Sequence, residues 1–212
     1  MKEILNDLRG LPTLMLGFTL MGFGIWMLKE SELGMPPWDC LTQGLSNFLP
    51  FTFGQLSQIS GLVILVIAIL LKVYPGIGTI LNIIFIGVFY DLFDNIFNIS
   101  IDMMAVNILY VIIGSFAMSL GTVLYMRKGL GQGPRDSVIL GVYRLYTIKY
   151  GFIKFGIEAV VLTIGIILGG TAGLGTVLAL FFISFFTQEI LNKIKLDPKT
   201  IEHKYLHKYT FK

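Results

Sequence analysis

Apolar residues gather into six long runs along this chain, and polar residues fill the segments between the runs. A helix of about 20 apolar residues crosses the hydrocarbon core of a bilayer, which is about 30 Å thick. The longer runs reach that length alone, and the shorter ones reach it with flanking residues. The pattern therefore predicts six transmembrane helices. The runs are 11–28, 59–71, 77–90, 104–125, 157–168 and 174–187.

The composition of the chain agrees with this pattern. Of its 212 residues, 55% are hydrophobic and only 14% are charged, whereas soluble domains carry about 25% charged residues. The deficit of charge excludes an ordinary soluble domain, and we expect an all-α integral membrane protein whose partner is the lipid bilayer. The net charge of +3 says little about other partners, and we expect no nucleic acid among them.

The two halves of the chain carry the same pattern of glycines. When the sequence is shifted by 97 residues, seven of the ten glycines between positions 17 and 87 fall on glycine, where chance gives roughly one at this composition. No gap is needed, which indicates a tandem duplication. The matched pairs are Gly17 with Gly114, Gly24 with Gly121, Gly34 with Gly131, Gly44 with Gly141, Gly54 with Gly151, Gly76 with Gly173, and Gly78 with Gly175.

Each copy predicts the same series of elements. A long apolar helix is followed by a segment broken by Gly and Pro, a short amphipathic segment, and two further helices joined by a tight turn that contains Gly. The short segments, 37–49 and 134–146, would be about 20 Å long as helices and cannot span the bilayer. We expect a three-helix repeat over 1–102, a second three-helix repeat over 103–197, and a basic tail over 198–212.

The distribution of Lys and Arg predicts the orientation of the two repeats. Three crossings per repeat place the second copy upside down relative to the first. With the N-terminus in the cytoplasm, the inner segments hold most of the Lys and Arg, as in 127–154, while the outer stretch 91–102 has three Asp and no Lys or Arg. Such a bias sets orientation in membranes. We therefore predict inverted repeats with both termini cytoplasmic.

The broken segments carry a paired motif, GMPPWD in the first copy and GQGPRD in the second. Proline suits the first turn of a helix, and an Asp there faces free backbone donors and the positive end of the helix dipole. Two half-helices that enter from opposite faces would point these ends toward the membrane midplane, as in transporter sites. The candidate binding residues in the motifs are Gly34, Pro37, Asp39, Gly131, Pro134 and Asp136.

The same short segments also fit a second interpretation. Their apolar residues recur at near-helical spacing, as they do in amphipathic helices that lie in the membrane interface. The two Asp residues would then be ordinary residues of a first helical turn. The sequence leaves open whether 37–49 and 134–146 are re-entrant or interfacial.

Two differences between the copies add candidate binding residues. Arg135 stands where the first copy has Trp38, and a cation beside a helix N-terminus suits an anion, although basic residues are also expected on the cytoplasmic side. Glu158 stands where the first copy has Gly61. A carboxylate within the membrane is a candidate for function, but Glu158 lies four residues after Lys154, so a pair that reaches toward the cytoplasm also explains it.

The paired Gly-x-x-Pro-x-Asp motifs, Gly34-Pro37-Asp39 and Gly131-Pro134-Asp136, carry a family resemblance. The chain resembles the bacterial YczE/YyaS/YitT group of polytopic membrane proteins over nearly its whole length, and its YczE branch most. The resemblance implies a multi-pass protein of the bacterial inner membrane, and transport is the function usually suspected for this group. It transfers no catalytic residues.

The leading functional prediction is a transporter or channel for a small solute, such as an anion or weak acid, with a site between the paired broken helices. The alternative is a non-transporting membrane partner of another complex, which the basic tail would help to dock. We expect no enzyme, cofactor or metal, because both histidines, His203 and His207, lie in the tail. A homodimer is plausible, since six helices around a site leave little scaffold.

Overall fold

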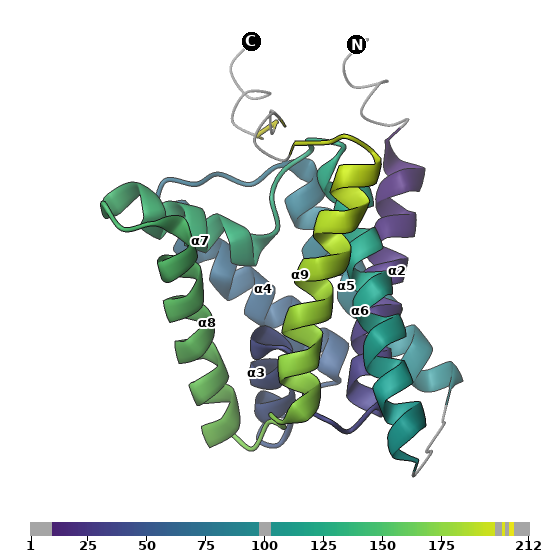
Figure 1. The fold of residues 1–212 in the computed structure, drawn as a ribbon. Helices are drawn as coiled ribbons and strands as arrows, with labels where there is room; N and C mark the ends of the chain where they lie inside the picture. The colour runs from purple at the N-terminus through teal and green to yellow at the C-terminus, as the bar shows by residue number, and fades with distance from the viewer. Residues whose placement is uncertain (1–9, 98–102, 198–200, 202–203, 206–212) are drawn as a thin grey trace.

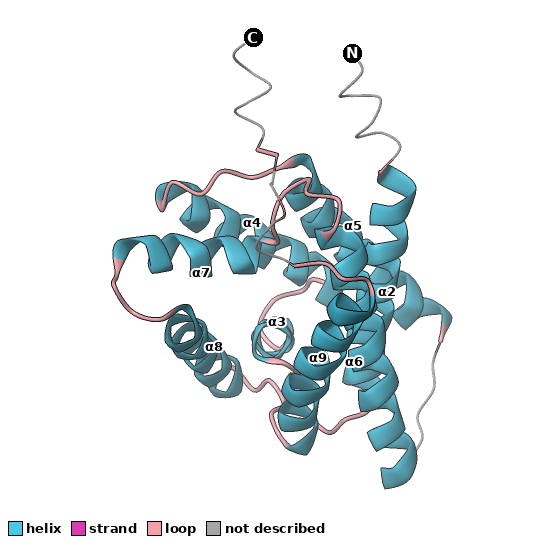
Figure 2. Ribbon diagram, turned by 45° about the horizontal axis from the view of Figure 1, so that its top comes forward, coloured by secondary structure: helices cyan, strands magenta, loops and turns pink. Residues whose placement is uncertain are grey.

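The computed structural model describes residues 10–97, 103–197, 201 and 204–205. All regular structure in this part of the chain is helical (Figures 1 and 2). The tail predicted over 198–212 lies outside the described residues except for 201, 204 and 205. The helices are α2 (Leu11–Glu30), α3 (Pro37–Ser46), α4 (Phe53–Leu70), α5 (Ile77–Ile96), α6 (Met104–Met126), α7 (Pro134–Leu145), α8 (Tyr150–Ile167) and α9 (Leu174–Lys193).

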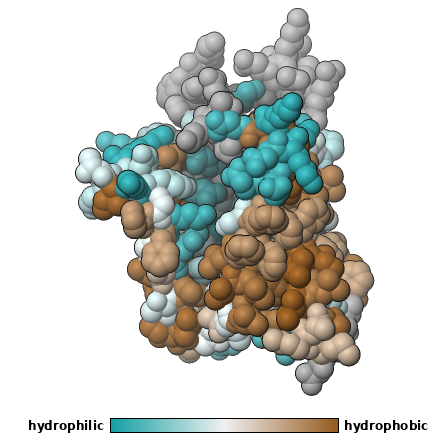
Figure 3. Space-filling view, viewed as in Figure 1, coloured by the Kyte–Doolittle hydropathy of each residue, from teal (hydrophilic) through white to brown (hydrophobic). Residues whose placement is uncertain are grey.

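Six of these helices are long and apolar enough to cross a membrane, namely α2, α4, α5, α6, α8 and α9. The prediction of an all-α integral membrane protein with six spans is therefore confirmed. The surface agrees with it, because a broad apolar area covers the lower part of the molecule in Figure 3, and hydrophilic side chains gather at the end where α2 begins and α9 ends. The two remaining helices, α3 and α7, have only 10 and 12 residues.

Two of the shorter apolar runs lie in helices that include flanking residues, as predicted. The apolar run 59–71 belongs to α4, which begins at Phe53, and the run 157–168 belongs to α8, which begins at Tyr150. At α4 the reason is a capping box: the Thr52 hydroxyl accepts from the Gln55 N–H, and the Gln55 side chain accepts from the Thr52 N–H. A polar first turn therefore belongs to the helix, although hydropathy alone assigns it to a loop.

The helix boundaries repeat along the chain with the spacing of the sequence duplication. Helix α7 begins 97 residues after α3, and both ends of α8 and of α9 lie 97 residues after those of α4 and of α5. The short helices end at Ser46 and Leu145, slightly before the predicted ends at 49 and 146. The series of elements predicted for each copy is therefore present in both halves.

The first helices of the two halves, α2 and α6, pack closely through glycine. A Cβ on Gly17 would lie 2.9 Å from the Gly121 carbonyl oxygen, and a Cβ on Gly24 would lie 2.5 Å from that of Gly114. Only glycine permits such an approach of two backbones. Since the earlier residue of α2 meets the later residue of α6, the two helices run antiparallel. The glycines that the repeat matches in sequence are thus the residues at which α2 and α6 approach most closely.

Two further contacts cross between the halves. Helix α3 packs on α8, and α7 packs on α4, so that α3 lies between α8 and α9 (Figure 2). The halves differ at one contact. Helix α4 touches α5 where Gly54 meets Gly87, but the counterpart Gly151 on α8 has open space where a Cβ would stand. Helix α8 is correspondingly the least buried of the six long helices.

Candidate functional site

The chain turns sharply before each short helix, and the motif glycines permit the turn. Gly34 has a φ of +110° and Gly131 a φ of +124°, which L side chains rarely adopt. Both also lie against the other half of the chain: a Cβ on Gly34 would be 2.7 Å from the Thr176 hydroxyl, and one on Gly131 would be 2.5 Å from the Thr79 hydroxyl. The two glycines are thus required by conformation and by packing.

Each broken segment is held by the start of a helix from the other half. The beginning of α9 donates two hydrogen bonds to carbonyl oxygens of the first segment, and the beginning of α5 donates the two equivalent bonds to the second segment. These bonds fix where α3 and α7 begin. The bonds are Gly175 N–H to Leu33 (2.7 Å), Thr176 Oγ1 to Met35 (2.9 Å), Gly78 N–H to Leu130 (2.7 Å) and Thr79 Oγ1 to Gln132 (2.7 Å).

An ion pair joins the first turns of α3 and α7. Pro37 and Pro134 are buried and occupy the first position of these helices, as predicted. In the next residues, Arg135 Nη2 donates to Asp39 Oδ1 at 2.8 Å. The Asp39 side chain has no exposed surface, whereas 30% of the Arg135 side chain is exposed. The structure thus brings together two candidate residues from different halves.

The two charged groups of this ion pair have different surroundings. The second carboxylate oxygen of Asp39, Oδ2, is buried and has no hydrogen-bond partner within the described residues. The guanidinium of Arg135 also lies over the ring of Trp38, with 5.7 Å between its central carbon and the ring centroid, a distance suited to a cation–π contact. Arg135, which occupies in the second copy the position of Trp38 in the first, therefore contacts Trp38.

The second aspartate, Asp136, lies in a different environment from Asp39. Its side chain is exposed and borders a cavity that Arg135 also lines. Two positions that are equivalent in sequence thus differ in burial, since Asp39 is fully buried and Asp136 is exposed.

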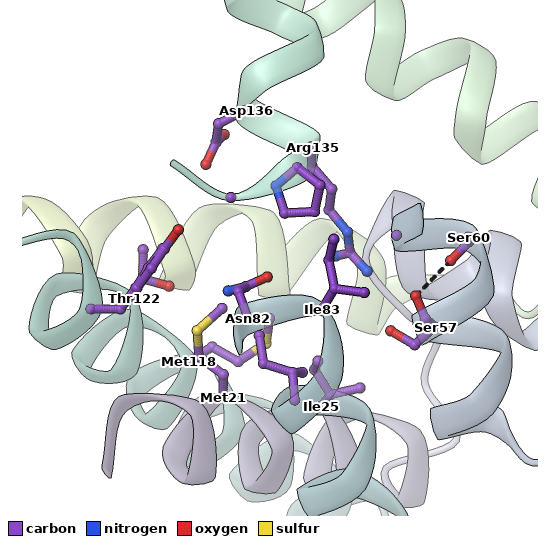
Figure 4. A pocket seen from close by; sticks show the side chains of 15 residues that line it. Met21, Ile25, Ser57, Ser60, Asn82, Ile83, Met118, Thr122, Arg135 and Asp136 are labelled. Carbon is purple, nitrogen blue, oxygen red and sulfur yellow. Dashed lines mark hydrogen bonds between the residues drawn. The ribbon is translucent and has the colours of Figure 1, made fainter. Parts of the chain in front are cut away.

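The cavity at the first turn of α7 has a volume of about 120 Å³. Figure 4 shows Arg135 and Asp136 along one side, with Asn82 pointing in from α5 and Thr122 from α6. Apolar side chains of α2, α5 and α6 form the opposite side. These apolar residues are Met21, Ile25, Ile83, Ile86 and Met118.

One further lining residue, Tyr125, was not foreseen from the sequence. It is 5% exposed, and its hydroxyl makes no hydrogen bond with the described residues. The nearby Thr79 hydroxyl already donates to Gln132 and accepts from the Gly76 N–H. A buried hydroxyl without a partner favours a polar occupant of the cavity. Tyrosine in an apolar run gives no signal of this role, because buried helices often contain it.

The candidate Glu158 is not part of this cavity. It lies on α8 and pairs with Lys154 at 3.8 Å, with 22% of its side chain exposed. The predicted Lys–Glu pair on one helix face is confirmed. No group of three His, Cys, Asp or Glu residues that could hold a metal is found among the described residues.

Comparisons with known proteins agree with the resemblance in sequence. Residues 8–192 match the family of unknown function DUF6198. An uncharacterized protein of Haemophilus influenzae is 31% identical over 185 residues, which cover 87% of this chain and 84% of that protein. The uncharacterized membrane protein YczE of Bacillus subtilis is 30% identical, with 76% of each chain covered, and the uncharacterized protein YyaS is 26% identical, with 77% and 83% covered. No solved structure matches the chain.

Proposed function

The chain belongs to the DUF6198 family, within the YczE and YyaS group of membrane proteins, and we propose that it carries a small solute across the membrane as a transporter or channel. The observation behind this proposal is the Asp39–Arg135 ion pair, which joins the first turns of two short helices beside a cavity with a polar and an apolar side. Charged and irregular segments among membrane helices are costly, and they persist where they line a path or a site.

An inverted arrangement of the two halves supports this function. The glycine contacts follow a two-fold symmetry. The repeat aligns Gly17 with Gly114 and Gly24 with Gly121, but in the structure Gly17 contacts Gly121 and Gly24 contacts Gly114, as expected for two copies related by a two-fold axis. The hydrogen bonds that hold the broken segments follow the same symmetry, since α9 of the second half holds the first segment and α5 of the first half holds the second. Inverted repeats with broken helices near the midplane form the substrate sites of many transporters.

We infer that α3 and α7 are re-entrant helices. An interfacial helix would keep one polar face in water, but Pro37, Asp39, Cys40 and Thr42 of α3 are all buried, and α3 lies against α8 and α4. The first turn of α7 meets α3 through Arg135. The bias of Lys and Arg supports an orientation with both termini in the cytoplasm, and the bacterial relatives support a location in the inner membrane.

The cavity fits a small anion or weak acid. Its volume of about 120 Å³ is several times the roughly 10–15 Å³ that one water molecule needs by the same measure. Arg135 offers a planar donor pair that suits a carboxylate or a similar anion. The apolar side of the cavity would take a short alkyl group. A small monocarboxylate combines these features.

Uptake by purified protein in liposomes tests the proposal. The protein should take up a small solute with saturable kinetics from a panel of anions, neutral solutes and amines, and Arg135→Gln should reduce uptake of the preferred solute at least tenfold. Lys128→Gln is the matched control, since it removes a nearby cation that does not line the cavity. The absence of saturable uptake for every solute of the panel would rule out the transport function.

The alternative function is a membrane partner of another complex. Part of the tail lies against the segment before α7, where the Lys204 N–H donates to the Gly129 carbonyl at 2.7 Å. Liposomes that contain only the purified protein distinguish the two functions. If the protein is a transporter, a chain truncated after residue 197 should retain uptake. The alternative would be favoured by two results together. The intact chain would transport no solute, and it would capture a partner protein that the truncated chain no longer captures.

A further inference from the structure

Asp39 is an ionisable side chain whose charge depends on a single partner. It is fully buried, and Arg135 is the one side chain that forms an ion pair with it in the described part of the chain. Its Oδ2 atom has no hydrogen-bond partner there. Removing the partner of a buried charge leaves that charge uncompensated, and a buried acid then takes up a proton.

Arg135 is shared between Asp39 and the cavity. Its side chain is partly exposed and lines the cavity, while Asp39 is not among the lining residues. Arg135 is therefore within reach both of Asp39 and of an anion that enters the cavity. Two anions on one guanidinium repel each other, and Asp136 at the same cavity adds a third negative charge.

Few other charges can compensate Asp39. Helix α3 contains no second charged residue, and the only other titratable group beside Asp39 on it is Cys40. Helix α4 contains no charged residue at all. On α8, Lys154 and Glu158 pair with each other, and the charge of Glu158 also interacts with those of Arg135 and Asp136. The charge balance of the ion pair therefore depends on what binds Arg135.

We propose that an anion bound at Arg135 displaces Asp39, which takes up one proton, so that each anion crosses the membrane together with one proton. This inference rests on the proposed transport function. The hydrogen bond from Arg135 to Asp39 breaks, a hydrogen bond from Arg135 to the anion forms, and a proton from water binds the carboxylate of Asp39. On the other side, the anion leaves, the proton returns to water and the ion pair forms again. The net charge of the site is the same in both states.

Methanesulfonate is a suitable probe, because it is a small anion that does not cross bilayers as a neutral acid. The full chain in liposomes, loaded with a pH-sensitive dye, is given radiolabelled methanesulfonate from outside. The expected result is saturable uptake with internal acidification at one proton per anion. This ratio in the unsubstituted chain tests the inference without any variant.

The variant Asp39→Asn then identifies the residue that carries the proton. Its ratio of protons to anions should fall from one to near zero, and its uptake should become sensitive to an imposed membrane potential. The matched variant is Asp136→Asn at the equivalent position of the second copy, which should keep the ratio at one even if its rate changes. An elution profile like that of the unsubstituted chain shows that each variant is folded.

The outcomes separate the two proposals. Methanesulfonate uptake without acidification, or a ratio of one that persists in Asp39→Asn, would refute the proton coupling and leave transport standing. Uptake of glycerol or ethylammonium with no uptake of methanesulfonate or acetate would also refute it. If the protein accelerated the entry of none of the four solutes relative to protein-free liposomes, the transport function itself would be ruled out.

Discussion

The ion pair between Asp39 and Arg135 predicts unequal effects for its two single substitutions. In Arg135→Gln, a fully buried carboxylate loses its counter-charge, and breaking a buried pair in this way costs about 3–5 kcal/mol. Since 30% of the Arg135 side chain is exposed, some of the pair is already hydrated, so we expect the lower end, about 3 kcal/mol. In Asp39→Asn, the remaining guanidinium still reaches the cavity and Trp38, so its charge can be hydrated.

Thermal unfolding of the purified protein in detergent measures this difference. For a chain of this size, 1 kcal/mol corresponds to about 2–4 °C in Tm, so Arg135→Gln should lower Tm by roughly 6–12 °C. Asp39→Asn should lower it by less than half as much. The double variant Asp39→Asn with Arg135→Gln should unfold at a higher temperature than Arg135→Gln alone, because it contains no buried charge at this site.

Two results would contradict the reasoning. Equal losses in the two single variants would mean that Asp39 is not the more desolvated partner. Strictly additive losses in the double variant would mean that the two side chains do not interact, since a double-mutant cycle measures their coupling directly. Either result would also weaken the proton-coupling inference, which depends on the same buried carboxylate.

Two further predictions follow from packing and from burial. Gly24→Ala should lower stability by about 1–3 kcal/mol, measured as Tm, because the new Cβ would lie 2.5 Å from the Gly114 carbonyl oxygen, whereas Gly156→Ala should be neutral or stabilising because nothing lies within 4 Å there. The fully buried thiol of Cys40 should react slowly with a membrane-impermeant maleimide, because burial and the Asp39 carboxylate raise the pKa of the Cys40 thiol and the thiolate is the reactive form. In denaturant the thiol should react fully, and fast labelling of the folded protein would contradict the buried position of α3. A double variant, Cys40→Ser with Ser137→Cys, should be labelled from the opposite side of the membrane, and labelling of both proteins from one side would contradict inverted repeats.

The sequence predicts the elements of this fold better than it predicts their contacts. Hydropathy and the glycine repeat identify six spans and two short helices, because burial in lipid and sharp turns demand particular residue types at each position. The same data do not reveal that Asp39 meets Arg135, because the two residues lie 96 positions apart and only the arrangement of the halves brings them together. Tyr125 was not predicted as a lining residue for a related reason, since its position beside the cavity depends on how other helices pack.

The differences between the two copies explain why the cavity, which residues of both halves line, has unlike walls. A perfectly repeated motif would place Trp and Asp at both first turns, and each buried Asp would then lack a cation. Arg135, at the position of Trp38, supplies that cation for Asp39, and the same side chain opens toward the cavity. On α5, Asn82 adds a polar group to the cavity, whereas its counterpart on α9 is the buried Ala179. The substitutions that break the repeat thus produce one charged pair and, beside it, a cavity with a polar and an apolar side, and the proposed solute site depends on this asymmetry.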